Sequence, residues 1–427
     1  MSRRMKDSGV EWIGEIPEDW KVGRVKNAFF IKKQKAEQDD PVILSLARDR
    51  VKVRDISSNE GQLAESYYNY NPVSKEDFLL NPMDLYSGAN CNVSRVEGVI
   101  SPAYVNLRYR GNNVPKYFDY YFKTQYWAMA LFAHGKGVSF DNRWTLNAET
   151  LMNYFIPLPS TETQSQIASY LDQKTATIDH IIEKTKESIE DYKLYKQSLI
   201  SEAVTKGLDP DVKFKDSGSI WLQDIPYHWQ VSRVGLIYEV ILGKMLCPSP
   251  PDESYTLEPY YCAADISFEG IADVERRRMW FNPFEKERYL VREGDLLVVE
   301  GGSSGTSAIA GIQLTPTFVQ NSVLIIRFNN ANDVRYLRYL MEYLVEVGYI
   351  ENVCNKATIF HLTREKMSNI PLPVFPQAEQ KAIADYLDLK TSHINKLVEN
   401  KEQLIEDLEA YKKSLIYEVV TGKREVQ

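Results

Sequence analysis

This chain contains an internal duplication, which constrains its possible folds more than any other feature of the sequence. The segment Lys6–Val25 returns as Lys215–Val234 at a constant offset of 209 residues, with 11 of the 20 aligned positions identical. A second block, Ile167–Thr205, returns as Ile383–Thr421 at a constant offset of 216 residues. The chain is therefore built from two halves, each with a variable segment followed by a repeated block.

Length and composition indicate several folded domains. The 427 residues exceed the roughly 100–200 residues of one compact domain. Hydrophobic residues make up 44% of the chain, which is enough to fill separate cores. The formal net charge of -8 excludes a uniformly basic surface but is compatible with a local basic groove.

The sequence favours an intracellular location. The charged N-terminal stretch does not resemble a signal peptide, and no apolar run is long enough to span a membrane. The four cysteines, Cys91, Cys247, Cys262 and Cys354, form no CxxC pair, which argues against a zinc cluster or a disulfide framework. A reducing, cytoplasmic setting is expected.

The repeated second block of each half is predicted to form one long helix. No glycine or proline interrupts residues 161–205 or 377–421. Apolar residues recur there in steps of three, four and seven, which places them on a single stripe. A helix of about 45 residues is about 65–70 Å long and cannot bury such a stripe against itself. The two helices are therefore expected to pair as an antiparallel coiled coil.

The variable segments, roughly 20–159 and 230–373, have the pattern of an α+β fold. Short apolar runs predict strands, and periodic segments predict short helices. The motif Asp77–Leu80 resembles Asp295–Val298 in sequence and in position, as expected for two copies of one fold. The clearest predicted strands are Val42–Leu44, Tyr104–Leu107, Leu296–Val299 and Val323–Ile326, and the predicted short helices cover 114–132 and 334–347.

The predicted fold class is thus α+β, with two similar α/β domains separated by two long antiparallel coiled-coil helices. The first domain with its N-terminal flank covers residues 1–159, and the first long helix covers 160–209. The second domain covers 210–373, and the second long helix covers 374–427. Aromatic residues repeated in the flanks and helices are expected to pack rather than to bind a ligand: Trp12, Trp20, Trp221, Trp229, Tyr192, Tyr195 and Tyr411.

Motifs typical of enzymes do not occur in the sequence. It contains neither a G-x-x-x-x-G-K-[ST] phosphate loop nor a G-x-G-x-x-G dinucleotide fingerprint, and the glycine-rich run Gly301–Thr306 matches no known phosphate cradle. The five histidines are scattered without metal-ligand spacing. The chain is therefore expected to catalyse nothing alone. A duplicated scaffold with diverged loops suits a protein that reads two different features at a fixed separation, although a duplicated structural protein would show the same pattern.

Several motifs together point to a family. The flank Lys6–Trp20, with its copy at 215–229, is followed in each half by an Ile-Pro-Leu-Pro block and the start of a long helix. These motifs occur in the same order in both halves and together span nearly the whole chain. With them, the sequence resembles the specificity subunit of type I restriction–modification systems. One departure is that Thr163 stands where the second copy has the family's glutamate, Glu379. Its loss is expected to weaken a local cap or pair without changing the fold.

The resemblance implies a role in a DNA-modifying complex. Each target-recognition domain would read one half of a bipartite, asymmetric site in double-stranded DNA, and the coiled coil would fix the spacer. Two modification (methyltransferase) subunits would dock on the chain, and two restriction/motor subunits can join them. S-adenosylmethionine, ATP and Mg are expected on those partners, and no cofactor or metal on this chain. The alternative is a coiled-coil scaffold or adaptor that binds other proteins.

Candidate DNA-contacting residues lie on polar loops of both variable segments. In the major groove, arginine can bind guanine and asparagine can bind adenine. Arginines in salt bridges, or residues of ordinary hairpin loops, would give the same sequence pattern without binding DNA. In the first domain the candidates are Arg48, Arg50, Ser87, Asn90, Lys136, Ser139, Asn142 and Arg143. In the second they are Lys244, Arg276, Arg277, Arg278, Ser303, Ser304, Thr306, Asn355, Lys356, Thr358 and His361.

Overall fold

The computed structural model of this chain describes residues 3–38, 40–55, 64, 66–83, 85–86, 90–137, 144–328, 332–354 and 361–426. They form two compact units, one comprising Met1–Thr185 with Glu402–Gln427 and the other Lys186–Lys401. Each unit contains one α+β domain and about half of each long helix. Each unit is therefore not one continuous stretch of the sequence. The first half of one long helix and the second half of the other pack with the same domain.

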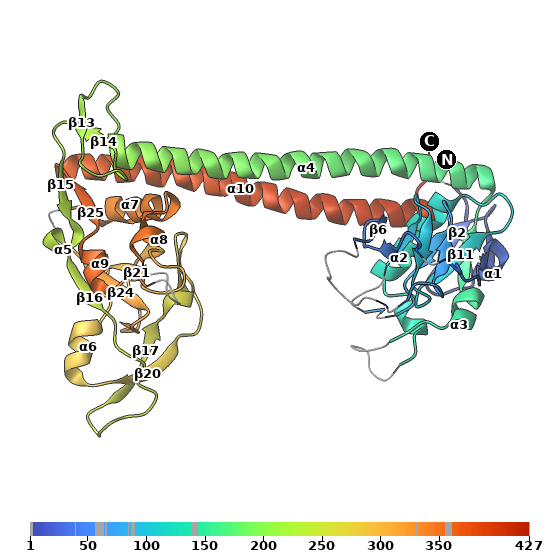
Figure 1. The fold of residues 1–427 in the computed structure, drawn as a ribbon, viewed down its shortest axis with the longest axis horizontal. Coiled ribbons are helices and arrows are strands. Elements are labelled where there is room, and N and C mark those ends of the chain that lie inside the picture. Colours follow the sequence, from blue (N-terminus) through green and yellow to red (C-terminus); the bar gives the residue numbers. More distant parts are fainter. Residues whose placement is uncertain are drawn as a thin grey trace. The chain divides into compact units, whose positions relative to one another are not determined.

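The core of the first unit is a four-stranded antiparallel sheet with the strand order β4-β11-β8-β9. Strand β11 and helix α2 are labelled in Figure 1. Every residue of the central strand β8 is buried, which explains its wholly apolar sequence. Helix α2 packs on this sheet, with the ring of Phe122 5.2 Å from that of Phe78. These elements are β4 (Phe29–Ile31), β8 (Phe78–Leu80), β9 (Cys91–Val93), β11 (Val105–Tyr109) and α2 (Pro115–Trp127).

Shorter elements complete the first domain. Strand pairs β1-β2, β3-β12, β5-β6 and β7-β10 are antiparallel. Strand β12 leads into the first long helix, α4 (Thr161–Lys206). The remaining bounds are β1 (Met5–Asp7), β2 (Glu15–Pro17), β3 (Lys21–Arg24), α1 (Val25–Ala28), β5 (Leu44–Leu46), β6 (Val51–Val53), β7 (Asn71–Val73), β10 (Gly98–Ile100), η1 (Phe132–His134), α3 (Ala148–Asn153) and β12 (Phe155–Leu158).

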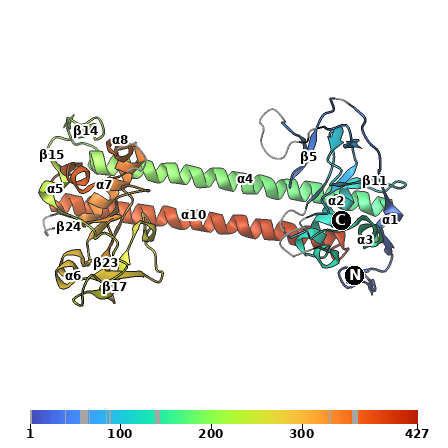
Figure 2. The same ribbon diagram turned by 60° about the horizontal axis from the view of Figure 1, so that its bottom comes forward.

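The second domain repeats this architecture. Its sheet has the order β16-β24-β21-β22, and α7 takes the place of α2. The domain also has a three-stranded sheet, β20-β17-β23, and the short helix α6 (Figure 2). The core elements are β16 (Glu239–Leu242), β21 (Leu296–Val299), β22 (Ser307–Ile309), β24 (Val323–Arg327) and α7 (Val334–Glu346).

The other elements of the second unit lie around that core. Strand β25 pairs with β15 and leads into the second long helix, α10 (Gln377–Val420). Their bounds are β13 (Phe214–Asp216), β14 (Asp224–Pro226), β15 (Gln230–Arg233), α5 (Val234–Ile237), β17 (Thr256–Tyr261), η2 (Ala263–Asp265), β18 (Ile266–Ser267), β19 (Gly270–Ile271), β20 (Arg277–Phe281), α6 (Pro283–Tyr289), β23 (Phe318–Val319), α8 (Tyr349–Val353), α9 (Arg364–Ser368) and β25 (Pro371–Val374).

Most local expectations agree with these bounds. The predicted short helices are confirmed as α2 and α7, and the predicted strands in 296–299 and 323–326 are confirmed as β21 and β24. The strand expected at Tyr104–Leu107 begins one residue later, as β11. The strand expected at Val42–Leu44 overlaps β5 only at Leu44. The Val42 carbonyl accepts from the Val99 amide of β10, and Ile43 forms only an isolated bridge to Val99.

A buried carboxylate precedes the central strand in both domains. Asp77 is fully buried and accepts hydrogen bonds from Arg108 (2.5 Å), Lys32 (3.0 Å) and the Ser74 amide (2.8 Å). Burial alone would raise the pKa of Asp77, but these three donors hold it below its usual value. The second domain has the same arrangement, since Arg327 donates two hydrogen bonds to the buried Asp295.

The long helices pair antiparallel within each unit. In the first unit, Ile178 and Ile182 of α4 share a buried cluster with Leu415 and Val419 near the end of α10. In the second, the start of α10 packs with the end of α4, and the two helices lie side by side in both views (Figures 1 and 2). The apolar stripes are thus buried near the two domains, but Leu397 and Leu404, which lie on the predicted stripe of α10, are 42% and 44% exposed. Within the described ranges, no helix is long and apolar enough to cross a membrane.

The N-terminal flank of each domain packs on the end of the long helix in its unit. Trp20 and Trp229 are both at most 1% exposed, and they lie beside Gly422 and Gly207, just after α10 and α4 respectively. The expected packing role of these two tryptophans is confirmed. The same expectation was wrong for Tyr195 and Tyr411, which are 52% and 48% exposed, because a helix with one helical partner buries only a narrow seam.

The two tryptophans differ in their polar contacts. The indole Nε1 of Trp229 donates to Glu379 (3.0 Å), whose other oxygen lies 2.8 Å from His228 Nε2. Thr163 stands at the position of Glu379 in the first copy, and Trp20 Nε1 is buried without a hydrogen-bond partner among the described residues. The predicted loss of a local pair is confirmed, and the fold is unchanged.

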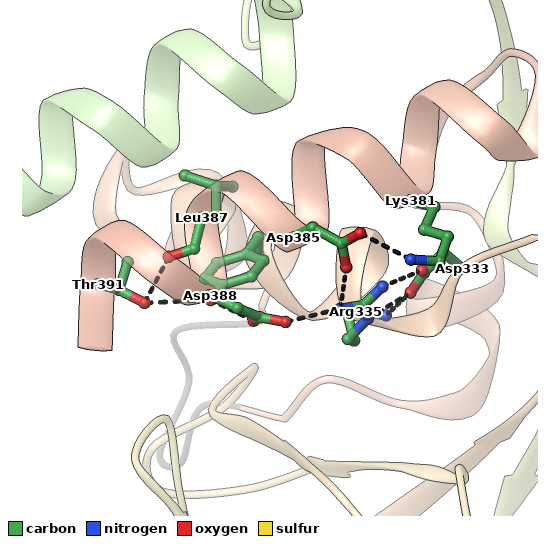
Figure 3. Close-up of polar contacts among 8 residues, drawn as sticks. Asp333, Arg335, Lys381, Asp385, Leu387, Asp388 and Thr391 are labelled. Atoms are coloured by element: carbon green, nitrogen blue, oxygen red, sulfur yellow. Dashed lines mark hydrogen bonds and ion pairs between the residues drawn. The ribbon is translucent and has the colours of Figure 1, made fainter. Parts of the chain in front are cut away.

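A second polar anchor ties each domain to a long helix. In the second unit, Arg335 contacts three carboxylates, Asp333 (2.6 Å), Asp385 (2.7 Å) and Asp388 (2.8 Å), as Figure 3 shows. Hydrogen bonds from Lys381 and from Arg335 lower the pKa of Asp385. The Arg335 anchor therefore joins the start of α7 to the first turns of α10.

The first domain has a smaller version of this anchor. Lys116 stands at the position of Arg335 and lies 3.0 Å from Asp119 and 3.9 Å from Asp172. One feature is shared: Tyr120 donates to Asp172 (2.7 Å), as Tyr339 donates to Asp388 (2.7 Å). The domains are thus anchored at equivalent points by different numbers of charges.

Candidate nucleic-acid interface

In each domain, two loops that are distant in sequence meet at one backbone hydrogen bond. The Leu146 amide donates to Pro82 O (2.7 Å) in the first domain, and the Leu362 amide donates to Glu300 O (2.6 Å) in the second. In both domains the first loop follows the central strand, β8 or β21, and the second precedes the short helix α3 or α9. We call this meeting point the loop junction. It brings together segments that the sequence analysis proposed separately.

The first loop of the second domain is a tight turn. Gly302 and Gly305 have φ of 84° and 87°, a conformation that L side chains rarely adopt. A Cβ atom on Gly305 would come within 2.8 Å of Val345, so this glycine also allows the loop to approach α7 closely. Ser304 Oγ donates to Glu300 O (2.9 Å), whereas Ser303 is exposed. The turn is therefore fixed by its backbone and presents Ser303 outward.

The second loop of that domain joins the first at His361. Gly301 and His361 form an antiparallel β-bridge, and His361 Nδ1 lies 2.7 Å from a carboxylate oxygen of Glu300. The structure therefore places the candidates Ser303, Ser304, Thr306 and His361 at one junction. Asn355, Lys356 and Thr358 lie outside the described residues.

Glu300 belongs to this junction but is not a candidate from the sequence. A glutamate directly after a buried strand resembles an ordinary strand end, so nothing local distinguishes it. The available signal was its place beside the glycine-rich run, immediately before Gly301.

The first domain has an aromatic loop junction. Trp144 Nε1 donates to Phe132 O (2.8 Å), and the Leu85 amide donates to Trp144 O (3.2 Å). Tyr86 is 62% exposed and its ring centroid lies 6.2 Å from that of Phe132. Tyr86 is a second residue that the sequence analysis missed.

Among the candidates of this junction, Lys136 is exposed and pairs through its backbone with Thr145. Ser87, Ser139, Asn142 and Arg143 lie outside the described residues. The described part of the first junction therefore combines one cation with exposed aromatic surface.

The other candidates of the first domain lie around the turn between β5 and β6. Arg48 and Arg50 are exposed there, with Arg50 Nε 3.6 Å from Asp49. The side-chain amide of Asn90 donates to Leu46 O (3.0 Å). This hydrogen bond holds the turn beside β9. Arg48 and Asn90 line one cleft with three lysines: Lys116, Lys123 and Lys412.

The basic candidates outside the second loop junction make contacts around the extra sheet. The Lys244 side chain is 10% exposed, contacts Glu285 and lies 4.7 Å from the centroid of the Tyr255 ring. The guanidinium carbon of Arg276 lies 4.6 Å from the centroid of the Tyr261 ring, and its Nη1 lies 3.8 Å from a carboxylate oxygen of Asp265.

The two arginines that follow Arg276 are both exposed. Arg277 donates to Cys262 Sγ (2.9 Å), and Arg278 lies next to it on β20. Arg277 and Arg278, at the start of β20, are therefore exposed cations on this sheet.

Comparisons with known proteins show the family of this chain. The sequence matches the family described as the type I restriction modification DNA specificity domain over residues 17–191 and again over 226–409, together most of the chain. The chain belongs to this family. The two matches correspond to the two halves of the duplication, so each α+β domain, with the start of the helix that follows it, is one specificity domain.

Relatives cover nearly the full length of this specificity-domain chain. It is 25% identical to the type I restriction enzyme MjaX specificity subunit of Methanocaldococcus jannaschii, over 97% of this chain and 96% of that protein. It is 22% identical to the MjaVIII specificity subunit of the same organism, over 96% of this chain and 94% of that protein.

Solved structures share the fold. A chain from a structure on complex assembly and conformational transition of the type I R-M system has a TM-score of 0.73 and 16% identity, covering 96% of this chain and 99% of its own. The HsdS subunit from Thermoanaerobacter tengcongensis has a TM-score of 0.59 and 15% identity, covering 96% and 98%.

Proposed function

We propose that this chain is the DNA sequence-specificity subunit of a type I restriction–modification complex. Each domain reads one half of a bipartite, asymmetric site, and the paired helices set the spacer between the halves. The observation that carries the proposal is the loop junction, which has the same backbone hydrogen bond in both domains but different side chains. A fixed scaffold with different presented groups is what reading two unlike half-sites requires.

The chemistry of the complex belongs to other chains in this proposal. Two modification subunits carry S-adenosylmethionine and methylate adenine, and restriction/motor subunits that use ATP and Mg can join them. This chain supplies sequence choice and is non-catalytic. Its acidic balance suits a subunit whose partners share the phosphate contacts, because few net cations remain for tight DNA binding alone.

A map of N6-methyladenine across the host genome, with the gene for this chain intact and deleted, tests the proposal. We expect one bipartite motif to lose methylation on deletion and to regain it when the gene is returned. The modification subunit is supplied from a plasmid in both strains, so a silent partner gene does not affect the result. No change in any methylated motif would contradict the proposal and favour an adaptor that binds other proteins.

A further inference from the structure

A cleft in the first unit brings together cations from elements that are distant in sequence. It has a volume of about 410 Å³ and lies between the turn that joins β5 to β6, helix α2 and the two long helices. We call it the Arg48 cleft. In a chain with a formal net charge of -8, its lining is a local concentration of positive charge. Two carboxylates, Asp49 and Asp179, face four cations there: Arg48, Lys116, Lys123 and Lys412.

The two carboxylates that line the Arg48 cleft are already paired. Asp179 lies 2.5 Å from Lys412 Nζ, and Asp49 lies 3.6 Å from Arg50 Nε. Arg48 itself is exposed, and within the described ranges its side chain forms no salt bridge. The guanidinium of Arg48 is therefore the charge of this cleft that is left for a ligand.

The two lysines that α2 contributes share one buried carboxylate. Lys116 and Lys123 each lie 3.0 Å from an oxygen of Asp119, and Lys116 is also 3.9 Å from Asp172. An ammonium group has three donors, so these contacts hold the lysines in place without using all their N–H groups. Arg48 and the lysines together suit an anion with several acceptor oxygens.

The Arg48 cleft adjoins the first loop junction. Tyr126 lines the cleft, and its hydroxyl donates to Asn81 O (2.8 Å). The Asn81 amide donates to Asn90 O (2.9 Å), and Asn90 lines the cleft as well. Asn81 directly precedes Pro82, whose carbonyl forms the junction. DNA that contacts the junction would therefore bring its sugar–phosphate backbone close to the cleft.

We infer that the Arg48 cleft binds a backbone phosphate of the DNA whose half-site the first domain reads. Arg48 donates to the phosphate oxygens as a planar fork, and Lys412 adds a point charge from the long helix. The guanidinium is charged at any pH at which the protein is folded, so the contact does not depend on a titration. Such a contact fixes the position of the duplex on the domain and carries no sequence information. The inference rests on the proposed function and assigns one of its contacts.

In the second unit, the cations that line the corresponding cleft are all in salt bridges. Glu342 stands on α7 at the position of Lys123 on α2, which reverses the charge there. Its carboxylate lies 3.5 Å from Lys196 and 3.0 Å from Arg338. The turn between β18 and β19 adds a further carboxylate, Glu269. The phosphate contact is therefore assigned to the first half-site alone.

The test uses the complete complex of this chain with its modification subunits, bound to DNA that carries the methylated motif. We expect Arg48→Gln to weaken binding about fivefold at about 0.15 M salt and to reduce the slope of log K against log salt by about one. Base preferences in both half-sites should stay as in the wild type. Phosphate ethylation interference should be lost at one phosphate, in the half-site that the first domain reads. Arg48→Lys should keep the salt slope.

Lys52→Gln is the matched control. Lys52 is an exposed cation on β6 of the same hairpin, but it does not line the Arg48 cleft. We expect its salt slope and interference pattern to equal those of the wild type. Asp179→Asn provides the opposite change, because it releases Lys412 from its carboxylate. It should tighten DNA binding and steepen the salt slope, which a folding defect could not produce.

Four results would overturn the inference. The first is an unchanged salt slope and interference pattern in Arg48→Gln. The second is an altered preference at one base pair in that variant, which identifies a base contact. The third is an equal loss in Lys52→Gln, which identifies a general effect of charge. The fourth is unchanged or weaker binding in Asp179→Asn. Failure of the proposed function would look different, because the wild-type complex would then show no bipartite motif.

Discussion

The two domains share a backbone plan but differ in how many polar contacts complete it. In the second domain, Trp229 donates to Glu379 and Arg335 contacts three carboxylates. At the equivalent positions of the first, Trp20 Nε1 has no partner among the described residues and Lys116 contacts two carboxylates. Apolar packing and the pair of a buried aspartate with an arginine are therefore sufficient for this fold, whereas the added polar contacts adjust its stability.

The largest expected effect concerns the feature that both domains share. Asp77→Asn and Asp295→Asn should each destabilise their own domain by about 2–3 kcal/mol, because each removes the charged acceptor from a set of buried hydrogen bonds. Hydrogen–deuterium exchange in the full chain reports each domain separately, through β8 and β21. Unequal losses would show that the buried aspartate does not stabilise the two domains equally.

Acid pH provides a second check on Asp77. Its pKa is lowered in the folded protein, so its stabilising contribution is fully present above the unfolded value of about 4 and is lost as pH falls through the folded value. Protection of β8 should therefore decline below about pH 4 in the wild type. In Asp77→Asn, the protection of β8 should be lower at neutral pH and should decline less on acidification. An equal decline in both proteins would contradict this reasoning.

The polar anchors should differ in strength. Arg335→Ala is expected to cost the second domain about 1–2 kcal/mol, because it leaves three carboxylates close together, whereas Lys116→Ala should cost the first domain under about 1 kcal/mol. Arg335→Lys, which installs the residue of the first domain, should fall between them. Exchange rates of α7 and α2 provide the measurement, and equal losses would show that the number of carboxylates is unimportant.

Replacing each tryptophan by phenylalanine removes only the indole donor and a little volume. Trp229→Phe should destabilise the second domain by about 1 kcal/mol more than Trp20→Phe destabilises the first, because only Trp229 loses a hydrogen bond. Urea unfolding followed by exchange at the ends of α4 and α10 measures both. A larger loss at Trp20 would mean that its Nε1 has a partner in solution.

The smallest effect is expected from moving the polar pair to the first domain. The double variant Asp19→His with Thr163→Glu gives Trp20 Nε1 an acceptor and should stabilise the first domain by about 0.5–1 kcal/mol. Thr163→Glu alone should gain less, because the new carboxylate would face Asp19. Melting of the double variant below the wild-type temperature would show that the pair stabilises only the second domain.

The sequence predicted the duplicated fold well because its signals are local. Seven-residue periodicity identified α4 and α10, and continuous apolar runs identified β21 and β24. The same local reasoning failed for Tyr195 and Tyr411, whose positions on the stripe do not reveal how narrow the seam between two helices is.

The candidate site was predictable only in outline. The glycine-rich run and His361 both indicated polar loops, but their contact joins residues 60 positions apart and depends on how β21 and α9 are placed. Glu300 and the two α10 carboxylates that contact Arg335, Asp385 and Asp388, were missed for the same reason. Pairing over such separations leaves no periodic signal in a single sequence.

Each domain of this chain is proposed to read its own half-site. The most direct measurement is the methylated motif of two variants in the complete complex: Arg143→Ala, in a predicted contact loop of the first domain, and the triple variant Ser303→Ala, Ser304→Ala and Thr306→Ala in the second. We predict that each variant alters a different half of the motif and leaves the other half and the spacer unchanged. Changes in the same half, or loss of complex assembly in either variant, would contradict the account.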